Sequence, residues 1–428
     1  MTFRLRAPRL GAPLVITAFV ALVGAVNAWR ALAPALAVPR PTLDNRPEER
    51  LQDFRDALYF PVREFLAGGN PYDPAAMFAH WPVRQSFNLY QPYHLVLHLP
   101  FALPGYRVGA VAFAVVSLLL LVVLAYLAAT RFRLRVPLPL AGATVGLATL
   151  LVASQVGKAQ LYVGQVNPLV AVGAAGALLL RKSNPRWAAV ALALAWLKPQ
   201  FGLPLAVLLF ARGSRRVVLA GTTVAAAATL PVVALLIVRG GGVGPFLDVI
   251  AANLAHAQET DYGAVDSLTA QRVDLAAVLF RVTGWLPPAA EGAALVAVLA
   301  VSVALVRALD RGGDPDHLVV SDLLTCLAVV VAVVHQPGDV LISFPAMASA
   351  AALWWQRRRE RRWQPLGWAV LALAVPYAHL HMVDTAIVSV FGERVSVTVD
   401  GVAVVACWAL LVGLAVRLSR RAAASAGR

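Results

Sequence analysis

The chain has 428 residues, of which 60% are hydrophobic and only 14% are charged, and its formal net charge is +15. Soluble domains carry about 25% charged residues, so this composition excludes an ordinary soluble protein. Runs of about 20 apolar residues recur along the chain, and each is long enough to cross a bilayer. The arginines cluster between these runs, which is typical of topology signals and argues against a nucleic-acid partner. We therefore expect an all-α polytopic membrane protein.

Basic clusters separate the apolar runs and predict a topology for one membrane domain, residues 1–428. The clusters lie at residues 4–9, 131–135, 181–186, 212–216, 307–311, 357–362 and 417–421. Cytoplasmic loops are enriched in Lys and Arg, so we place all of these clusters and both termini inside the cell. About ten spans follow. They fall near residues 10–29, 106–130, 138–156, 164–180, 217–238, 289–309, 318–335, 338–354, 366–383 and 400–416.

The same map assigns the other segments. Residues 187–211 have basic clusters at both ends and an internal Lys-Pro, which predicts a re-entrant hairpin of two short helices. The short apolar segment 93–104 falls on the outer face. Two long polar segments, residues 30–92 and 239–288, become extracytoplasmic loops. Short outer links join them at residues 156–168, 335–339 and 384–399. Polar residues therefore gather on the outer side, which favours an enzyme or a transporter over an anchor.

The first outer loop contains an unusual concentration of acids among aromatic residues. Apolar residues recur along 51–66 with a period close to 3.6, which predicts an amphipathic helix on the outer membrane surface. Asp53, Asp56 and Glu64 lie off the apolar stripe. These three acids either form a solvated polar face, or one of them is a carboxylate with a raised pKa that can act as a base.

Lys198 is the most informative single position. It is one of only three lysines in the chain, and it lies within an apolar run where Gln200 is the nearest polar residue. A charge at membrane depth is costly and is by default a functional candidate. Lys198 either extends its ammonium to the membrane interface or binds a phosphate that enters from the lipid.

Three further polar residues mark the outer ends of spans. Gln165 and Asn167 precede one span, and Asn167 with Pro168 is also a simple helix-capping pattern. His335 follows another span and is either a polar cap or a site residue. No His, Cys and carboxylate spacing matches a metal site, and no nucleotide-binding fingerprint occurs, so we expect no metal and no cofactor. Cys326 and Cys407 read as small buried hydrophobes.

Several segments in order resemble glycosyltransferase family 87. They are "DFRDALYFPVREFLAGGNPYDP" (53–74), "LYQPYHLVLHLPFALP" (89–104), "GQVNPLVAVGAAGALLL" (164–180) and "ALAWLKPQFGLPLAVLLFARGSRR" (193–216). The segment "AVDSLTAQRV" (264–273) is similar to the family's Asn-x-Ser-Leu segment with a following arginine, although Asp266 replaces the usual Asn. The segment "HQPGDVLISFPA" (335–346) is only loosely similar to a later family motif.

The resemblance implies a GT-C fold and a membrane transferase that uses a polyprenyl-phosphate sugar. The acceptor would be a glycolipid or a cell-envelope glycan at the extracytoplasmic face of the cell membrane, and the sugar would be of the mannose or arabinose type. The family's catalytic carboxylate maps to Asp53. Asp56 is the rival, because one residue more than the pattern expects separates Asp53 from the Pro-Tyr pair. The implied substrate-binding residues are Lys198 and Arg272 for the donor phosphate, with Tyr90, Gln165, Asn167 and His335.

Two other classes of function remain open at this point. A transporter or flippase of a lipid-linked sugar would use the same polar cavity and the same lysine. It should show internal repeats with matching broken helices, whereas the sequence shows one broken segment, residues 187–211. A non-catalytic membrane scaffold would need neither Lys198 nor the clustered outer acids.

Overall fold

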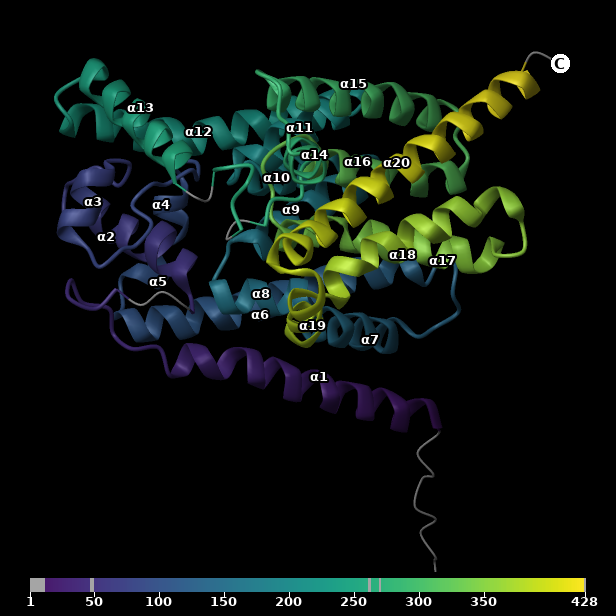
Figure 1. Ribbon diagram of the computed structural model, residues 1–428, viewed down its shortest axis with the longest axis horizontal. Coiled ribbons are helices and arrows are strands. Elements are labelled where there is room, and N and C mark those ends of the chain that lie inside the picture. The colour runs from purple at the N-terminus through teal and green to yellow at the C-terminus, as the bar shows by residue number, and fades with distance from the viewer. Residues whose placement is uncertain (1–11, 47–49, 261–262, 269–270, 427–428) are drawn as a thin grey trace, which may run out of the picture.

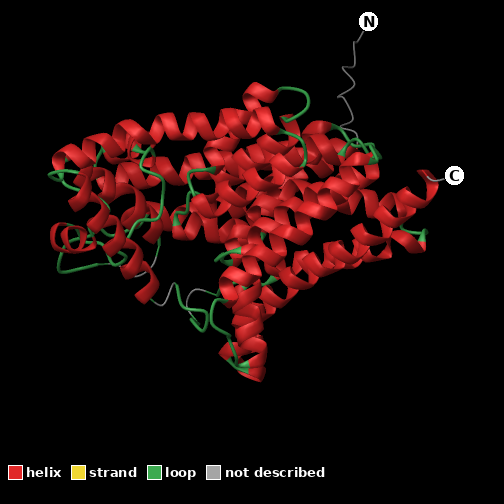
Figure 2. Ribbon diagram, turned by 90° about the horizontal axis from the view of Figure 1, so that it is seen from above, coloured by secondary structure: helices red, strands yellow, loops and turns green. Residues whose placement is uncertain are grey.

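The computed structural model describes residues 12–46, 50–260, 263–268 and 271–426. Helices and connecting loops make up this part of the chain, and no strand occurs in it apart from an isolated bridge between Thr42 and Asn45. Figure 2 shows the same composition from above. The predicted all-α class is confirmed. The basic cluster at residues 4–9 lies outside the described residues.

Six helices are long and apolar enough to cross a membrane. They are α1 (Ala12–Leu36), α6 (Tyr106–Phe132), α12 (Arg215–Arg239), α15 (Ala290–Arg311), α16 (Pro315–Ala332) and α20 (Glu393–Ala426). Two bent pairs raise the number to eight if each pair is one span. These are α7 (Leu140–Ala153) with α8 (Gln155–Val163), bent by 67°, and α18 (Gln364–Ala378) with α19 (His381–Phe391), bent by 95°. The polytopic membrane class is confirmed.

Shorter helices occupy the other two predicted spans. α9 (Asn167–Leu180) and α17 (Phe344–Arg357) have 14 residues each. At a rise of 1.5 Å per residue each is about 21 Å long, less than the ~30 Å hydrocarbon core. The figure of about ten crossings therefore stays a prediction.

The remaining helices are short and cluster around the polar segments. They are η1 (Phe54–Tyr59), α2 (Phe60–Leu66), α3 (Pro74–His80), α4 (His94–Leu97), α5 (Leu99–Ala102), α10 (Pro185–Ala195), α11 (Pro199–Ala211), α13 (Val243–Glu259), α14 (Leu275–Thr283), η2 (Pro337–Ser343) and η3 (Arg361–Trp363). In Figure 1, α2 to α5 lie together at the left, next to α13, and the C-terminus lies at the right.

The segment between α9 and α12 folds back on itself, as predicted from the basic clusters at both of its ends. Arg181, which ends α9, places Nη1 3.2 Å from Oδ2 of Asp310. Arg212, which ends α11, places Nε 2.9 Å from the same oxygen. Arg212 also contacts Asp322 at 2.7 Å. Both ends of the segment therefore lie together, and the break at Lys198 lies at the opposite turn.

These ion pairs define one end of the bundle, which we call the basic end. Arg135, after α6, belongs to it and lies 2.8 Å from Asp316 at the start of α16. The helices that end there begin at the polar segments, which form the site end. The two long polar segments meet at that end, where Asn88 and Asn253 exchange side-chain to backbone hydrogen bonds of 2.9 and 2.8 Å. The separation of the two ends is the arrangement expected from the positive-inside rule.

The predicted amphipathic surface helix at 51–66 is wrong. Its first part is the π-helix η1, in which the backbone N–H of Phe60 donates to the carbonyl of Arg55. Its apolar residues other than Leu66 are buried as expected, but so are Asp56 and Glu64, which are 1% and 3% exposed. Asp56 is paired with Arg55, and Glu64 accepts a 2.6 Å hydrogen bond from Nε1 of Trp81. Because partners inside the protein satisfy these acids, the helix needs no solvated face.

The sidedness can be tested with single cysteines in a variant whose buried Cys326 and Cys407 are replaced by Ala. Ala75 and Gln258 are exposed at the site end, and Ser183 is exposed at the basic end. We expect cysteines at Ala75 and Gln258 to react with an impermeant maleimide in intact cells. A cysteine at Ser183 should react only after lysis. The reverse pattern would invert the topology.

Candidate active site

Lys198 lies at the break between α10 and α11. Its backbone is extended, as favoured before the proline at position 199, and its carbonyl accepts hydrogen bonds from the first turn of α11. The side chain is buried at 7% exposure, and Nζ lies 5.4 Å from the ring centroid of Tyr90 and 5.9 Å from that of Phe201. Among the described residues no carboxylate lies within ion-pair distance of this ammonium. The ammonium is thus surrounded by protein side chains, and the choice between a phosphate contact and extension to the membrane interface stays a prediction.

Asp53 lies immediately before η1 and faces the same region. Its side chain makes no capping hydrogen bond to the helix, and it is half-buried. Burial raises the pKa of Asp53 to about 6. The positive charge of Lys198 acts in the opposite direction and lowers this pKa, while the nearby carboxylates of Asp56 and Asp339 raise it. A hydrogen bond from Gln165 also favours the charged form of the carboxyl group.

A polar network brings Gln165 and Asn167 to this carboxylate. Nδ2 of Asn167 donates to Oε1 of Gln165 and, at 2.7 Å, to Oδ1 of Asp339. Asp339 is in turn fixed in a capping box with Gln336, whose backbone N–H donates to Oδ2 at 2.8 Å. Asn167 is the first residue of α9 and not its cap, and its Oδ1 accepts no hydrogen bond from the described residues, so the simple capping interpretation is wrong.

Gly164 explains why this network can approach Asp53 so closely. Its φ is +75°, a left-handed conformation that favours glycine, and it ends α8. A Cβ atom at this position would lie 2.9 Å from Cβ of Phe54 and 3.0 Å from Cδ2 of Leu51. The backbone N–H of Leu51 donates to the carbonyl of Tyr162 at 2.6 Å. The turn at Gly164 is thus packed directly against the start of the Asp53 segment.

Two buried polar atoms in the site have no hydrogen-bond partner among the described residues. They are Nε2 of His335 and Oδ1 of Asn167. His335 is 1% exposed, donates through Nδ1 to the carbonyl of Val333 at 3.0 Å, and packs its ring 4.4 Å from that of Phe201. Buried polar atoms are normally satisfied, so unpaired ones in a site are typical of ligand contacts. The interpretation of His335 as a polar cap explains the hydrogen bond of Nδ1 and leaves Nε2 unexplained.

Two predicted site residues are engaged elsewhere. Asp56 accepts two hydrogen bonds from Arg55, at 2.6 and 2.9 Å, and two from the backbone N–H groups of residues 84 and 85. Arg272 is buried, pairs with Asp274 at 2.8 Å and contacts Glu291 and the carbonyl of Gly263. Its neighbour Val273 donates to the carbonyl of His335 at 2.8 Å. Arg272 therefore lies beside the site with its own charge already neutralised.

The structure brings together most of the predicted residues. Those that converge are Asp53, Tyr90, Gln165, Asn167, Lys198 and His335. Sequence reasoning missed Asp339 and Phe201. Asp339 lies four residues after His335 in a link already assigned to the outer side, and its carboxyl group there was the available signal. In the described part of the chain no group of three or more His, Cys, Asp or Glu side chains is placed to hold a metal ion.

The fold and the site define a multi-span helical membrane protein with a buried polar site at one end of its bundle. The sequence model of glycosyltransferase family 87 matches residues 88–337, more than half of the chain. The chain therefore belongs to glycosyltransferase family 87, and the protein is a membrane glycosyltransferase. The GT-C arrangement implied by the family is consistent with the helical bundle.

The matched region contains every candidate from Tyr90 to His335, whereas Asp53, Asp56 and Asp339 lie outside it. No curated protein and no solved structure matches the chain significantly. The assignment of the acids therefore depends on the geometry of the site.

The two rival acids can be separated by Asn substitutions. Asp53→Asn keeps the shape but cannot accept a proton, so we expect a loss of about 10²–10⁴-fold in transfer rate with an unchanged melting temperature. Asp56→Asn removes the carboxylate that neutralises buried Arg55. We expect it to lower the free energy of unfolding by about 3–5 kcal/mol. The measurements are thermal unfolding and sugar transfer by both purified variants. If Asp56→Asn is inactive but fully stable while Asp53→Asn is active, the base is Asp56 and not Asp53.

Proposed function

We propose that the protein transfers a sugar of the mannose or arabinose type from a polyprenyl-phosphate donor to a glycolipid or cell-envelope glycan. The reaction takes place at the extracytoplasmic face of the cell membrane. The observation that carries the proposal is a buried lysine without a carboxylate partner beside a half-buried aspartate. A buried ammonium needs an anion to offset the loss of hydration, and the phosphate of a lipid donor supplies one at this depth.

The proposed chemistry is a direct displacement. Lys198 holds the donor phosphate and stabilises the negative charge that grows on it as the bond to the anomeric carbon breaks. The acceptor hydroxyl forms the new bond to that carbon from the opposite side and gives its proton to Asp53. The anomeric configuration is inverted. The phosphate leaves without protonation, so a second carboxylic acid is not needed.

The other converging residues have a role in holding the sugar. Oδ1 of Asn167 and Nε2 of His335 are unpaired acceptors that suit two sugar hydroxyl groups. The rings of Tyr90 and Phe201 form the apolar side of the lysine pocket and keep its ammonium in place. Asp339 fixes Asn167 and raises the pKa of Asp53, so it acts as a positioning residue. Arg272 is left with a structural role beside His335.

Donor use and the role of Lys198 can be measured together. Membranes that contain the protein would be incubated with radiolabelled polyprenyl-phosphate sugars of several kinds, and the lipids extracted. We expect label to move to a new product with one donor. Lys198→Ala should weaken donor binding by about 30- to 150-fold, since a charge-assisted contact is worth about 2–3 kcal/mol. Lys198→Arg should retain part of the affinity.

Two outcomes of this experiment would contradict the proposal. Equal donor affinity in the wild type and in Lys198→Ala would show that Lys198 does not bind the donor phosphate. An absence of transfer with every donor, together with movement of an intact lipid-linked sugar across the membrane, would favour the flippase instead.

The pH dependence follows from the environment of Asp53. Because its pKa is raised to about 6, the charged base is lost as the pH falls below that value. We expect kcat/KM to rise with pH to a plateau, with a midpoint at about 6. Lys198 lowers this pKa, so Lys198→Gln should move the midpoint upward. A profile that stays flat to well below pH 5, recorded with a donor phosphodiester that does not titrate in this range, would exclude Asp53 as the base.

A further inference from the structure

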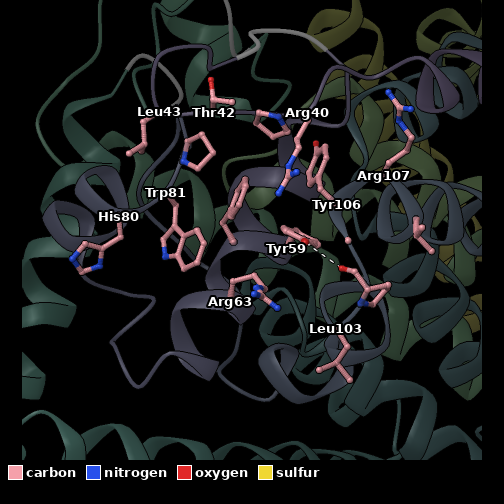
Figure 3. A pocket seen from close by; sticks show the side chains of 16 residues that line it. Arg40, Thr42, Leu43, Tyr59, Arg63, His80, Trp81, Leu103, Tyr106 and Arg107 are labelled. Carbon is pink, nitrogen blue, oxygen red and sulfur yellow. Dashed lines mark hydrogen bonds between the residues drawn. The ribbon is translucent and has the colours of Figure 1, made fainter.

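A cavity of about 870 Å³ lies at the site end beside the Asp53 segment. Figure 3 shows its lining, with the side chains of Arg40, Arg63 and Arg107 arranged around Tyr59 and Tyr106. The three arginines come from the loop after α1, from α2 and from the start of α6. We call this space the arginine cavity. None of its three arginines is used by the proposed chemistry.

The arginine cavity carries a concentration of positive charge. Within the described residues, no carboxylate lies within ion-pair distance of Arg40, Arg63 or Arg107. Glu64, next to Arg63, is engaged by Trp81 at 2.6 Å and by His80 at 3.2 Å. Arginines at the site end also run against the bias that places such residues in cytoplasmic loops. Topology therefore does not explain them.

The arginine cavity lies beside the ends of two helices that are long enough to span a membrane. α1 ends at Leu36, four residues before Arg40, and α6 begins at Tyr106, one residue before Arg107. Both helices are among the six that can span the membrane. Tyr59, Trp81 and Tyr106 line the cavity, and Tyr and Trp are the residues enriched at the membrane interface.

The cavity and the proposed base share one helix. Asp53 precedes η1 and Tyr59 ends it, so at most about 9 Å of helix axis separates them at a rise of 1.5 Å per residue. Between them lies Phe54, whose ring centroid is 5.8 Å from that of Tyr59 and 6.0 Å from that of Tyr106. A ligand held in the arginine cavity is therefore one aromatic side chain away from the Asp53 segment.

We propose that the arginine cavity binds the phosphate-bearing headgroup of an anionic lipid, and that this lipid is the sugar acceptor. Guanidinium groups match the geometry of phosphate oxygens, because their forked N–H donors can form two parallel hydrogen bonds to one phosphate. The volume falls in the range of sites for small molecules and headgroups. Binding of the anionic lipid stands by itself, whereas its role as acceptor rests on the proposed function.

The binding step can be tested on the purified full-length protein by calorimetric titration. The probes are dihexanoyl phosphatidylglycerol, which is anionic, dihexanoyl phosphatidylcholine, which is zwitterionic, and glycerol 3-phosphate. We expect phosphatidylglycerol to bind about tenfold or more tightly than either other probe. The combined variant Arg40→Gln, Arg63→Gln and Arg107→Gln should lose this preference. The corresponding Lys variant should retain part of it, and Arg133→Gln, a matched control at the other end of α6, should keep it fully.

Each other outcome contradicts the binding step. Equal affinity for the two lipids in the wild type, or an unchanged preference in the combined Gln variant, would show that the cavity does not select anionic headgroups. Glycerol 3-phosphate binding as tightly as phosphatidylglycerol, with loss in the Gln variant, would assign the cavity to a soluble anion. Thermal unfolding of each variant would identify any loss of lipid preference that reflects misfolding. If the Gln variant misfolds, the Lys variant is compared with the wild type instead.

The acceptor role needs a separate measurement with the transfer assay. We expect the combined Gln variant to raise the KM for acceptor lipid about tenfold or more, with kcat and donor affinity unchanged. A lost lipid preference with an unchanged acceptor KM would leave a lipid site that is not the acceptor site. If the wild type transfers no sugar, the proposed function fails, and the lipid titration still decides whether the cavity binds an anionic headgroup.

Discussion

The site depends on one electrostatic arrangement, a buried lysine that pairs with no carboxylate in the described part of the chain and lies beside a half-buried aspartate. Neither group alone would suit this environment, since burial disfavours both charges. Together they place a positive charge beside a carboxyl group whose pKa is raised to about 6, and the proposed donor binding rests on this pair. The helix break at Lys198 provides the position, and the rings of Tyr90 and Phe201 lie beside the ammonium.

The surrounding structure serves to hold these two charges apart and in place. Asp339 is itself fixed by a capping box, and it reaches Asn167 rather than Lys198. If Asp339 instead neutralised the lysine, the proposed phosphate contact would lose its charge attraction. The hydrogen bonds of Asn167 and Gln165 therefore keep the second acid occupied. Arg272 is kept out of the pocket in a similar way, by Asp274 and Glu291.

Much of this architecture could be predicted from the sequence, because the membrane imposes strong rules on composition and charge. The clusters at Arg181 and Arg212 placed the ends of the broken segment correctly, and the rarity of lysine singled out Lys198. The burial of Asp56 and Glu64 could not be predicted, because their partners Arg55 and Trp81 become apparent only in three dimensions. Asp339 was missed for the same reason, since its contact with Asn167 joins residues 172 positions apart.

The π-helical winding of η1 also bears on how this segment tolerates a change of length. A hydrogen bond from Phe60 to Arg55 encloses one residue more than the bond of an ordinary α-helix. An inserted residue can thus be taken up within a single wide turn, while the chain on both sides keeps its helical phase. The resemblance to the family implies one extra residue between Asp53 and the Pro-Tyr pair, and this wide turn lies within that interval. Such an insertion would leave the position of Asp53 unchanged, because the backbone of η1 takes up the shift in register.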